Sequence, residues 1–154
     1  MPTMTTAVQL GFVLGTLLYS YFSVADRFSP VRVFMISSML AAGSTWAVLV
    51  GYRSLVGLFI ARLGVGFFLA GVYPVGMKIC SEWYQTGLGK ALGYLVGALV
   101  LGTAFPYILK SFSLTLPWEY VIYTTSALAV CGGIVVGFFV NDGPYRRMAG
   151  RFNP

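Results

Sequence analysis

Residues 61–76, A-R-L-G-V-G-F-F-L-A-G-V-Y-P-V-G, hold a single charged side chain, Arg62, inside a long apolar run. An arginine at the centre of a membrane helix costs about 2.5–3.5 kcal/mol on insertion scales, and such arginines usually face a bundle interior or a water-filled pathway. A cost of that size needs a reason. Arg62 is therefore the first candidate functional residue of the chain.

The composition around this stretch indicates an integral membrane protein. Hydrophobic residues make up 58% of the 154 residues and charged residues 9%, whereas soluble domains contain roughly 25% charged residues. Ten Lys and Arg residues outnumber four Asp and Glu residues, but they are scattered between apolar runs. This distribution is typical of cytoplasmic membrane loops and argues against nucleic acid as a partner.

Five apolar segments, each close to the roughly 20 residues of a spanning helix, divide the chain. Continuous apolar runs favour helices over the alternating strands of a membrane barrel. The predicted fold is an all-α integral membrane bundle over residues 1–140, in contact with the lipid bilayer, followed by a cytoplasmic tail over 141–154. The predicted transmembrane helices are 5–25, 33–52, 54–77, 91–109 and 120–140.

The positions of the basic residues predict the orientation. Two connections hold only Arg53 and Lys110. The positive-inside rule assigns the more basic connections to the cytoplasm, so the N-terminus lies outside and the C-terminus inside the plasma (inner) membrane. The predicted cytoplasmic set is Arg27, Arg32, Lys78, Lys90, Arg146, Arg147 and Arg151.

The third segment has two different faces. Gly57, Gly64 and Gly71 recur every seven residues and project about 140–180° away from Arg62 at 100° per residue. Tyr73 falls near the arginine's own face. We therefore expect the glycines to pack against a neighbouring helix, and Arg62 and Tyr73 to face the interior as substrate or coupling residues.

Small and hydroxyl-bearing residues suggest close packing elsewhere. Gly11-x-x-x-Gly15 in the first segment and Gly93-x-x-x-Gly97 in the fourth have the spacing of tightly packed membrane helices. The serines and threonines of the first two segments have two interpretations. They could line a hydrophilic cavity, or they could form hydrogen bonds between helices.

Metal, cofactor and enzyme chemistry have little support in the sequence. Cys80 and Cys131 lie about fifty residues apart and the chain has no histidine, so neither a zinc site nor a disulfide framework is expected. The interpretation as two small apolar residues is favoured over a redox pair. No cluster of nucleophile and base is present, so the protein is predicted not to be an enzyme.

The loop D-R-F-S-P-V-R, residues 26–32, lies between the first two apolar segments. It is similar to the acidic-basic motif between the second and third helices of the Major Facilitator Superfamily of transporters, and Asp26, Arg27 and Arg32 are the residues that match. Arg62, followed by two glycines, resembles the arginine-glycine motif of the fourth helix. The five segments then correspond to the second to sixth helices, a partial N-terminal bundle.

This resemblance implies secondary active transport of a small solute by alternating access. Arg62 would face the central cavity. Asp26, Arg27, Arg32 and Glu82 would contribute to a cytoplasmic gate, although the loop pair could also be an ordinary solvated pair worth little energy. As a transporter, the chain would require the helices it lacks or a partner chain. The alternative is a non-transporting membrane component or a truncated gene product.

The counterpart of Arg62 is left open by the sequence. No Asp, Glu or His lies inside the five segments. The arginine could pair with a residue from the missing helices, with a substrate anion, or with water and backbone carbonyls. An organic anion is the substrate class that the lone arginine favours.

Overall fold

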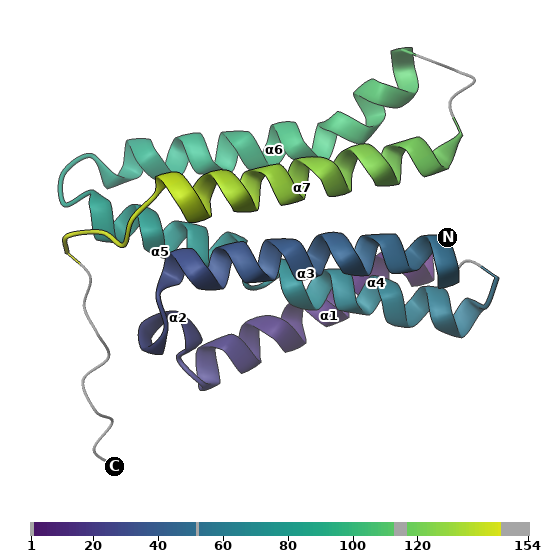
Figure 1. The fold of residues 1–154 in the computed structure, drawn as a ribbon, viewed down its shortest axis with the longest axis horizontal. Helices are drawn as coiled ribbons and strands as arrows, with labels where there is room; N and C mark the ends of the chain where they lie inside the picture. Colours follow the sequence, from purple (N-terminus) through teal and green to yellow (C-terminus); the bar gives the residue numbers. More distant parts are fainter. Residues whose placement is uncertain (1, 52, 113–116, 146–154) are drawn as a thin grey trace.

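A computed structural model describes residues 2–51, 53–112 and 117–145, and the regular structure in these ranges is entirely helical. The long helices run roughly along one axis, in the order α6, α7, α3 and then α4 with α1 (Figure 1). The helices are α1 Pro2–Tyr21, α2 Val24–Arg27, α3 Pro30–Gly51, α4 Leu55–Leu69, α5 Tyr73–Trp83, α6 Leu88–Phe112 and α7 Trp118–Phe139. The predicted all-α membrane fold is confirmed.

Four stretches of the described chain are long and apolar enough to cross a membrane: Pro30–Gly51, Leu55–Trp83, Leu88–Ile108 and Trp118–Phe139. The sequence predicts five. The difference is α1, which has 20 residues but carries Gln9 together with threonine, serine and tyrosine side chains that lower its apolar character. This helix runs parallel to α4 and packs along it, with Gly11 against Leu63 and Gly15 against Phe67.

The predicted helix over 54–77 is divided into two. Ser54 caps the start of α4 by accepting a hydrogen bond from the Gly57 N–H at 3.4 Å. The helix ends at Leu69, and α5 begins at Tyr73 with Pro74 in its first turn. Proline has no N–H to continue the preceding helix and is suited to the start of a new one.

The fourth predicted segment is longer in the structure and bent. It forms α6, Leu88–Phe112, where the sequence predicts 91–109. Pro106 lies inside this helix, and the last turns of α6 point away from the direction of its first turns (Figure 1). A proline ring removes one backbone hydrogen bond and is the usual cause of such a kink.

Glycines allow α1 and α4 to approach each other closely. A Cβ atom added at Gly11 would collide with the carbonyl of Leu63, and one added at Gly66 would collide with the carbonyl of Val8. At Gly15 the nearest side-chain atom would be the Ala70 Cβ, at 2.8 Å. The close packing predicted from Gly11-x-x-x-Gly15 is therefore present, with α4 as the partner.

The basic residues gather at one end of the bundle. The α2 to α3 turn, the α5 to α6 connection and the end of α7 all lie at this end, whereas the α3 to α4 connection lies at the other (Figure 1). The first end carries Arg27, Arg32, Lys78 and Lys90, and the second carries Arg53. We call the first end the basic end.

Candidate functional site

Arg62 lies at the centre of α4, as the eighth of its fifteen residues. Its side chain is partly buried, and its Nε has no hydrogen-bond partner among the described residues. At 100° per residue, Arg62 points about 90° away from the α4 face that contacts α1 and about 135° away from the face that contacts α3. The arginine therefore lies on a third face of the helix.

Three predicted packing glycines all lie against α3. A Cβ added at Gly57 would be 3.3 Å from the carbonyl oxygen of Gly51, and one added at Gly64 would be 3.3 Å from the Oγ of Ser44. At Gly71 it would collide with the Ser37 side chain. This face of α4 and of the turn after it thus has the close contact with a neighbour that a glycine seam permits.

Gly93 and Gly97 have a different environment. An added Cβ at either position would meet nothing within 4 Å in the described part of the chain. None of the α6 residues between Leu88 and Ile108 is buried. In the described part of the chain, no helix therefore packs closely against the Gly93-x-x-x-Gly97 motif.

Tyr73 is separated from Arg62 by a short turn between α4 and α5. The projection of both residues onto one face assumes a regular helix, but the N–H groups of Gly71 and Val72 bond to carbonyls three residues earlier instead of four. The side chain of Tyr73 is partly buried at the start of α5. The projection that joined Tyr73 to Arg62 therefore does not apply across this turn, and the role of Tyr73 stays a prediction.

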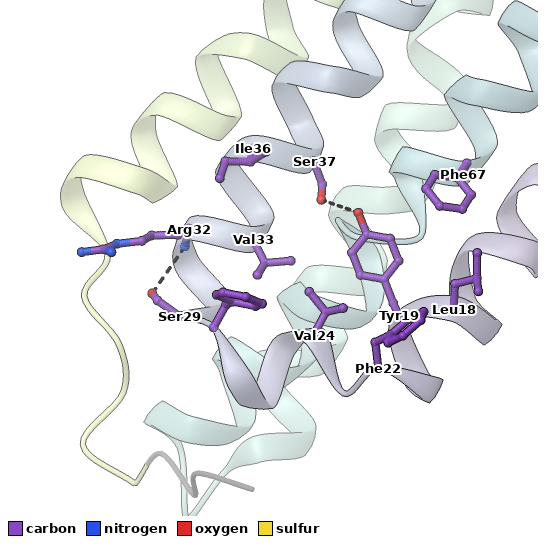
Figure 2. A pocket seen from close by; sticks show the side chains of 11 residues that line it. Leu18, Tyr19, Phe22, Val24, Ser29, Arg32, Val33, Ile36, Ser37 and Phe67 are labelled. Carbon is purple, nitrogen blue, oxygen red and sulfur yellow. Dashed lines mark hydrogen bonds between the residues drawn. The ribbon is translucent and has the colours of Figure 1, made fainter.

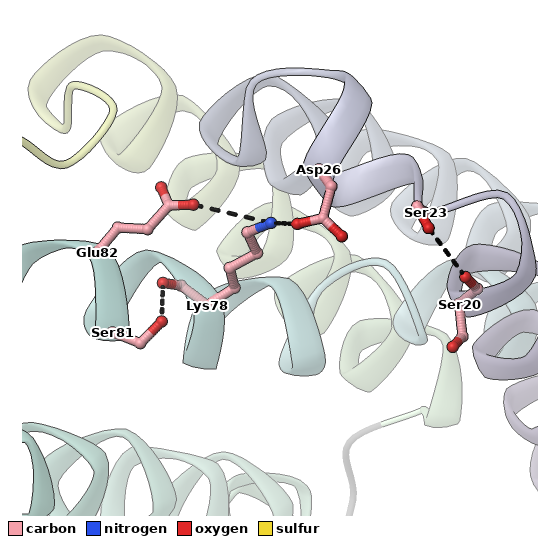
Figure 3. A network of polar contacts seen from close by, with 6 residues as sticks. All are labelled: Ser20, Ser23, Asp26, Lys78, Ser81 and Glu82. Atoms are coloured by element: carbon pink, nitrogen blue, oxygen red, sulfur yellow. Dashed lines mark hydrogen bonds and ion pairs between the residues drawn. The ribbon is translucent and has the colours of Figure 1, made fainter. Parts of the chain in front are cut away.

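A charge network at the basic end joins two of the four predicted gate residues. Lys78 of α5 donates a hydrogen bond to the Asp26 carboxylate of α2, and its Nζ is 3.8 Å from Glu82 Oε1 (Figure 3). Glu82 is 5% exposed. A buried carboxylate requires a nearby cation or hydrogen-bond donors, and Lys78 supplies the cation.

Lys78 is the residue that sequence analysis missed in this network. Its spacing of four residues from Glu82 on a helix places the two side chains on one face, and this signal was available in the sequence. Arg27 and Arg32 do not join the network in the described residues. The Arg32 backbone N–H contacts Ser29 Oγ at 3.4 Å, while its guanidinium remains exposed.

The first residues of the predicted tail are held against the network. The Trp83 indole N–H donates to the Asn141 carbonyl at 3.0 Å, and the Tyr145 N–H donates to the Glu82 carbonyl at 3.2 Å. Gly143 is buried against Glu82, where an added Cβ would overlap the Glu82 backbone. Residues 141–145 thus form a strap over the end of α5, and the rest of the tail lies outside the described residues.

A family comparison gives these features a context. The family model described as Major Facilitator Superfamily matches residues 1–152. The chain belongs to this superfamily. A search of curated proteins and a search of solved structures each returned no match. The match to the superfamily includes the loop with Asp26, the arginine of α4 and the strap.

Membership of the Major Facilitator Superfamily identifies the class of activity. Proteins of this superfamily are transporters and not enzymes, and they work in contact with a lipid bilayer. The transported species is a small molecule. In the described ranges, no three His, Cys, Asp or Glu side chains are grouped closely enough to hold a metal ion.

Proposed function

We propose that this superfamily member moves a small organic anion by secondary active transport, and that Arg62 binds the anion. The observation that supports the proposal is a central arginine whose Nε is buried and has no partner among the described residues. The arginine lies on a face of α4 that neither α1 nor α3 occupies. A positive charge in this position favours an anionic ligand because the surroundings screen it poorly.

The acidic residues of the described chain support a ligand rather than an internal partner for Arg62. Asp26 and Glu82 lie at the basic end in contact with Lys78. Asp142 accepts a hydrogen bond from Ser29 at 2.6 Å, also at this end. Glu119 is in the first turn of α7, at the opposite end. The central part of the described helices therefore offers Arg62 no carboxylate.

The charge network fits a cytoplasmic gate in this proposal. Asp26 and Lys78 join α2 to α5, and the strap joins the end of α5 to residues that follow α7. Such bonds hold the basic ends of several helices together. In alternating access, two helix bundles rock about a central site. The network would stabilise the state closed at the basic end, and a second bundle would form the opposite wall of the cavity.

The proposed orientation in the membrane follows from the basic residues at this end of the molecule. The basic end faces the cytoplasm and the start of α1 faces outward, in the plasma membrane. A substrate released toward the cytoplasm would then leave past Asp26, Lys78 and Glu82.

Counterflow in vesicles that contain the protein tests the substrate class. Vesicles are loaded in turn with unlabelled carboxylates, phosphate esters, neutral sugars and amines, and uptake of the matching labelled solute is measured. We expect accumulation with at least one anionic class and none with sugars or amines. Accumulation of neutral or cationic solutes alone would contradict the proposal for Arg62, and accumulation of none would favour a non-transporting component.

A further inference from the structure

A groove of about 560 Å³ opens between α1, α2 and α3 at the basic end and extends to Phe67 of α4 (Figure 2). Its lining is mainly apolar and includes the exposed rings of Phe22 and Phe28. The other apolar side chains that line it are Leu18, Val24, Val33 and Ile36. The lining is therefore suited to hydrocarbon rather than to polar groups.

The hydroxyl groups that line the groove already have partners. The Tyr19 hydroxyl and the Ser37 hydroxyl are 3.1 Å apart and form a hydrogen bond (Figure 2). Ser29 Oγ donates to Asp142. A polar ligand group placed here would have to break one of these bonds to be satisfied, which carries a desolvation cost. The part of a ligand that enters the groove is therefore apolar.

One end of the groove is basic. Arg32 lines the groove, and its guanidinium extends beyond the apolar side chains (Figure 2). Arg27 directly precedes Phe28, which also lines the groove. Within the described residues, neither guanidinium takes part in an ion pair or a side-chain hydrogen bond. The acidic neighbour of Arg27, Asp26, is paired instead with the lysine of α5.

We propose that this groove binds one anionic phospholipid of the cytoplasmic leaflet. An acyl chain lies along the apolar lining, and the phosphate binds Arg32 with Arg27 nearby. Guanidinium groups suit phosphate because they form paired, charge-assisted hydrogen bonds. A zwitterionic lipid fills the same groove, but its compensating positive charge reduces the attraction to the arginines. The bound lipid would join α1, α2 and α3, and the site is separate from Arg62.

Fluorescence quenching by brominated lipids tests this site. The Phe22→Trp variant puts an indole on the groove wall, and Phe139→Trp puts one at the same end of α7, on an exposed position outside the groove. Both are placed in vesicles of mixed phosphatidylglycerol and phosphatidylcholine, with bromine on the chains of one lipid at a time. The signal of the unsubstituted protein is subtracted. We expect Phe22→Trp to report about fivefold selectivity for phosphatidylglycerol and Phe139→Trp to report none.

Substitutions at the basic end separate charge from folding. Adding Arg32→Gln to Phe22→Trp should reduce the selectivity to near one, whereas Arg32→Lys should retain most of it because the charge remains. Arg53→Gln, at the opposite end of the bundle, should leave it unchanged. The proposal is overturned by equal selectivity at positions 22 and 139, or by selectivity that survives Arg32→Gln. It is also overturned if Arg32→Lys and Arg53→Gln lower the selectivity as much as Arg32→Gln does.

Discussion

Lys78 has two acidic neighbours that differ in their exposure to water. Asp26 has a side chain that is 41% exposed, whereas the side chain of Glu82 is 6% exposed. Water can replace the lysine at the exposed carboxylate but not at the buried one. Most of the stabilisation that Lys78 provides should therefore come from its position beside Glu82, although its shorter contact is with Asp26.

We predict that Lys78→Met lowers the free energy of unfolding by about 2 kcal/mol, between the values for exposed and buried pairs. Asp26→Asn should cost less than about 1 kcal/mol because its carboxylate is half exposed. Unfolding by denaturant in mixed micelles, followed by circular dichroism, measures both.

The double variant Lys78→Met with Glu82→Gln provides the matched control. The amide removes the buried negative charge, so part of the loss caused by Lys78→Met should be recovered, and the two substitutions should not be additive. Additive losses, or equal costs for Lys78→Met and Asp26→Asn, would show that the buried carboxylate does not depend on Lys78.

Residue-level prediction from the sequence succeeded where the chemistry was local. The apolar run around Arg62 predicted a helix with the arginine near its middle, and Arg62 is the eighth of the fifteen residues of α4. For Tyr73 the helical projection is not a valid guide, because projection applies only inside one regular helix and a turn lies between Leu69 and Tyr73. The pairing of Lys78 with Asp26 depends on α2 approaching α5, a contact between distant segments that the sequence does not specify, whereas its pairing with Glu82 is local to α5.

The Gly-x-x-x-Gly motifs of α1 and α6 lie in very different surroundings. The glycines Gly11 and Gly15 of α1 and Gly66 of α4 permit contact between backbones. Gly93 and Gly97 of α6 face open space within the described chain. A Gly-x-x-x-Gly pattern therefore indicates that a helix can be approached closely, but it does not identify the partner.

We predict that Gly66→Ala destabilises the protein by about 1–3 kcal/mol, because the new methyl group must separate α4 from the Val8 carbonyl. Gly97→Ala should change the free energy of unfolding by less than about 0.5 kcal/mol. The same denaturant unfolding assay compares the two. A loss at Gly97→Ala as large as that at Gly66→Ala would mean that another helix packs on α6.

Helix boundaries were predictable to the extent that single residues determine them. Pro74 and Pro106 mark the break between α4 and α5 and the bend in α6. The extension of α5 to Trp83 was not predicted. The apolar run used to mark the segment ends before Lys78, Ser81 and Glu82, whereas the helical backbone hydrogen bonds continue past these residues. Charged residues end a membrane segment without ending a helix.

At the scale of the whole molecule, charge separates the two ends of the bundle. Helices of alternating direction bring loops that are far apart in sequence to the same end, and the described basic residues around two such connections, α2 to α3 and α5 to α6, lie together. The positive-inside rule uses only the number of Lys and Arg residues in the loops at each end, which explains why the orientation could be proposed before any packing was known. Which helices are neighbours, such as α3 with α7, required the structure.

Cysteine labelling tests the proposed orientation. In a background of Cys80→Ser and Cys131→Ser, Gln85→Cys and Arg53→Cys place one exposed thiol at each end of the bundle. We expect a membrane-impermeant maleimide to react with Gln85→Cys only in inside-out vesicles and with Arg53→Cys only in right-side-out vesicles. The reverse pattern would invert the orientation and place the basic end outside.

The measurement that tests the central claim most directly is uptake of the anion identified by counterflow, compared among the parent, Arg62→Gln and Arg53→Gln. We predict that Arg62→Gln lowers uptake at low substrate concentration by at least about 30-fold, the factor that corresponds to about 2 kcal/mol for a buried charge contact. Arg53→Gln should retain the parent rate. Uptake by Arg62→Gln at the parent rate, or an equal loss in both variants, would contradict a substrate-binding role for Arg62.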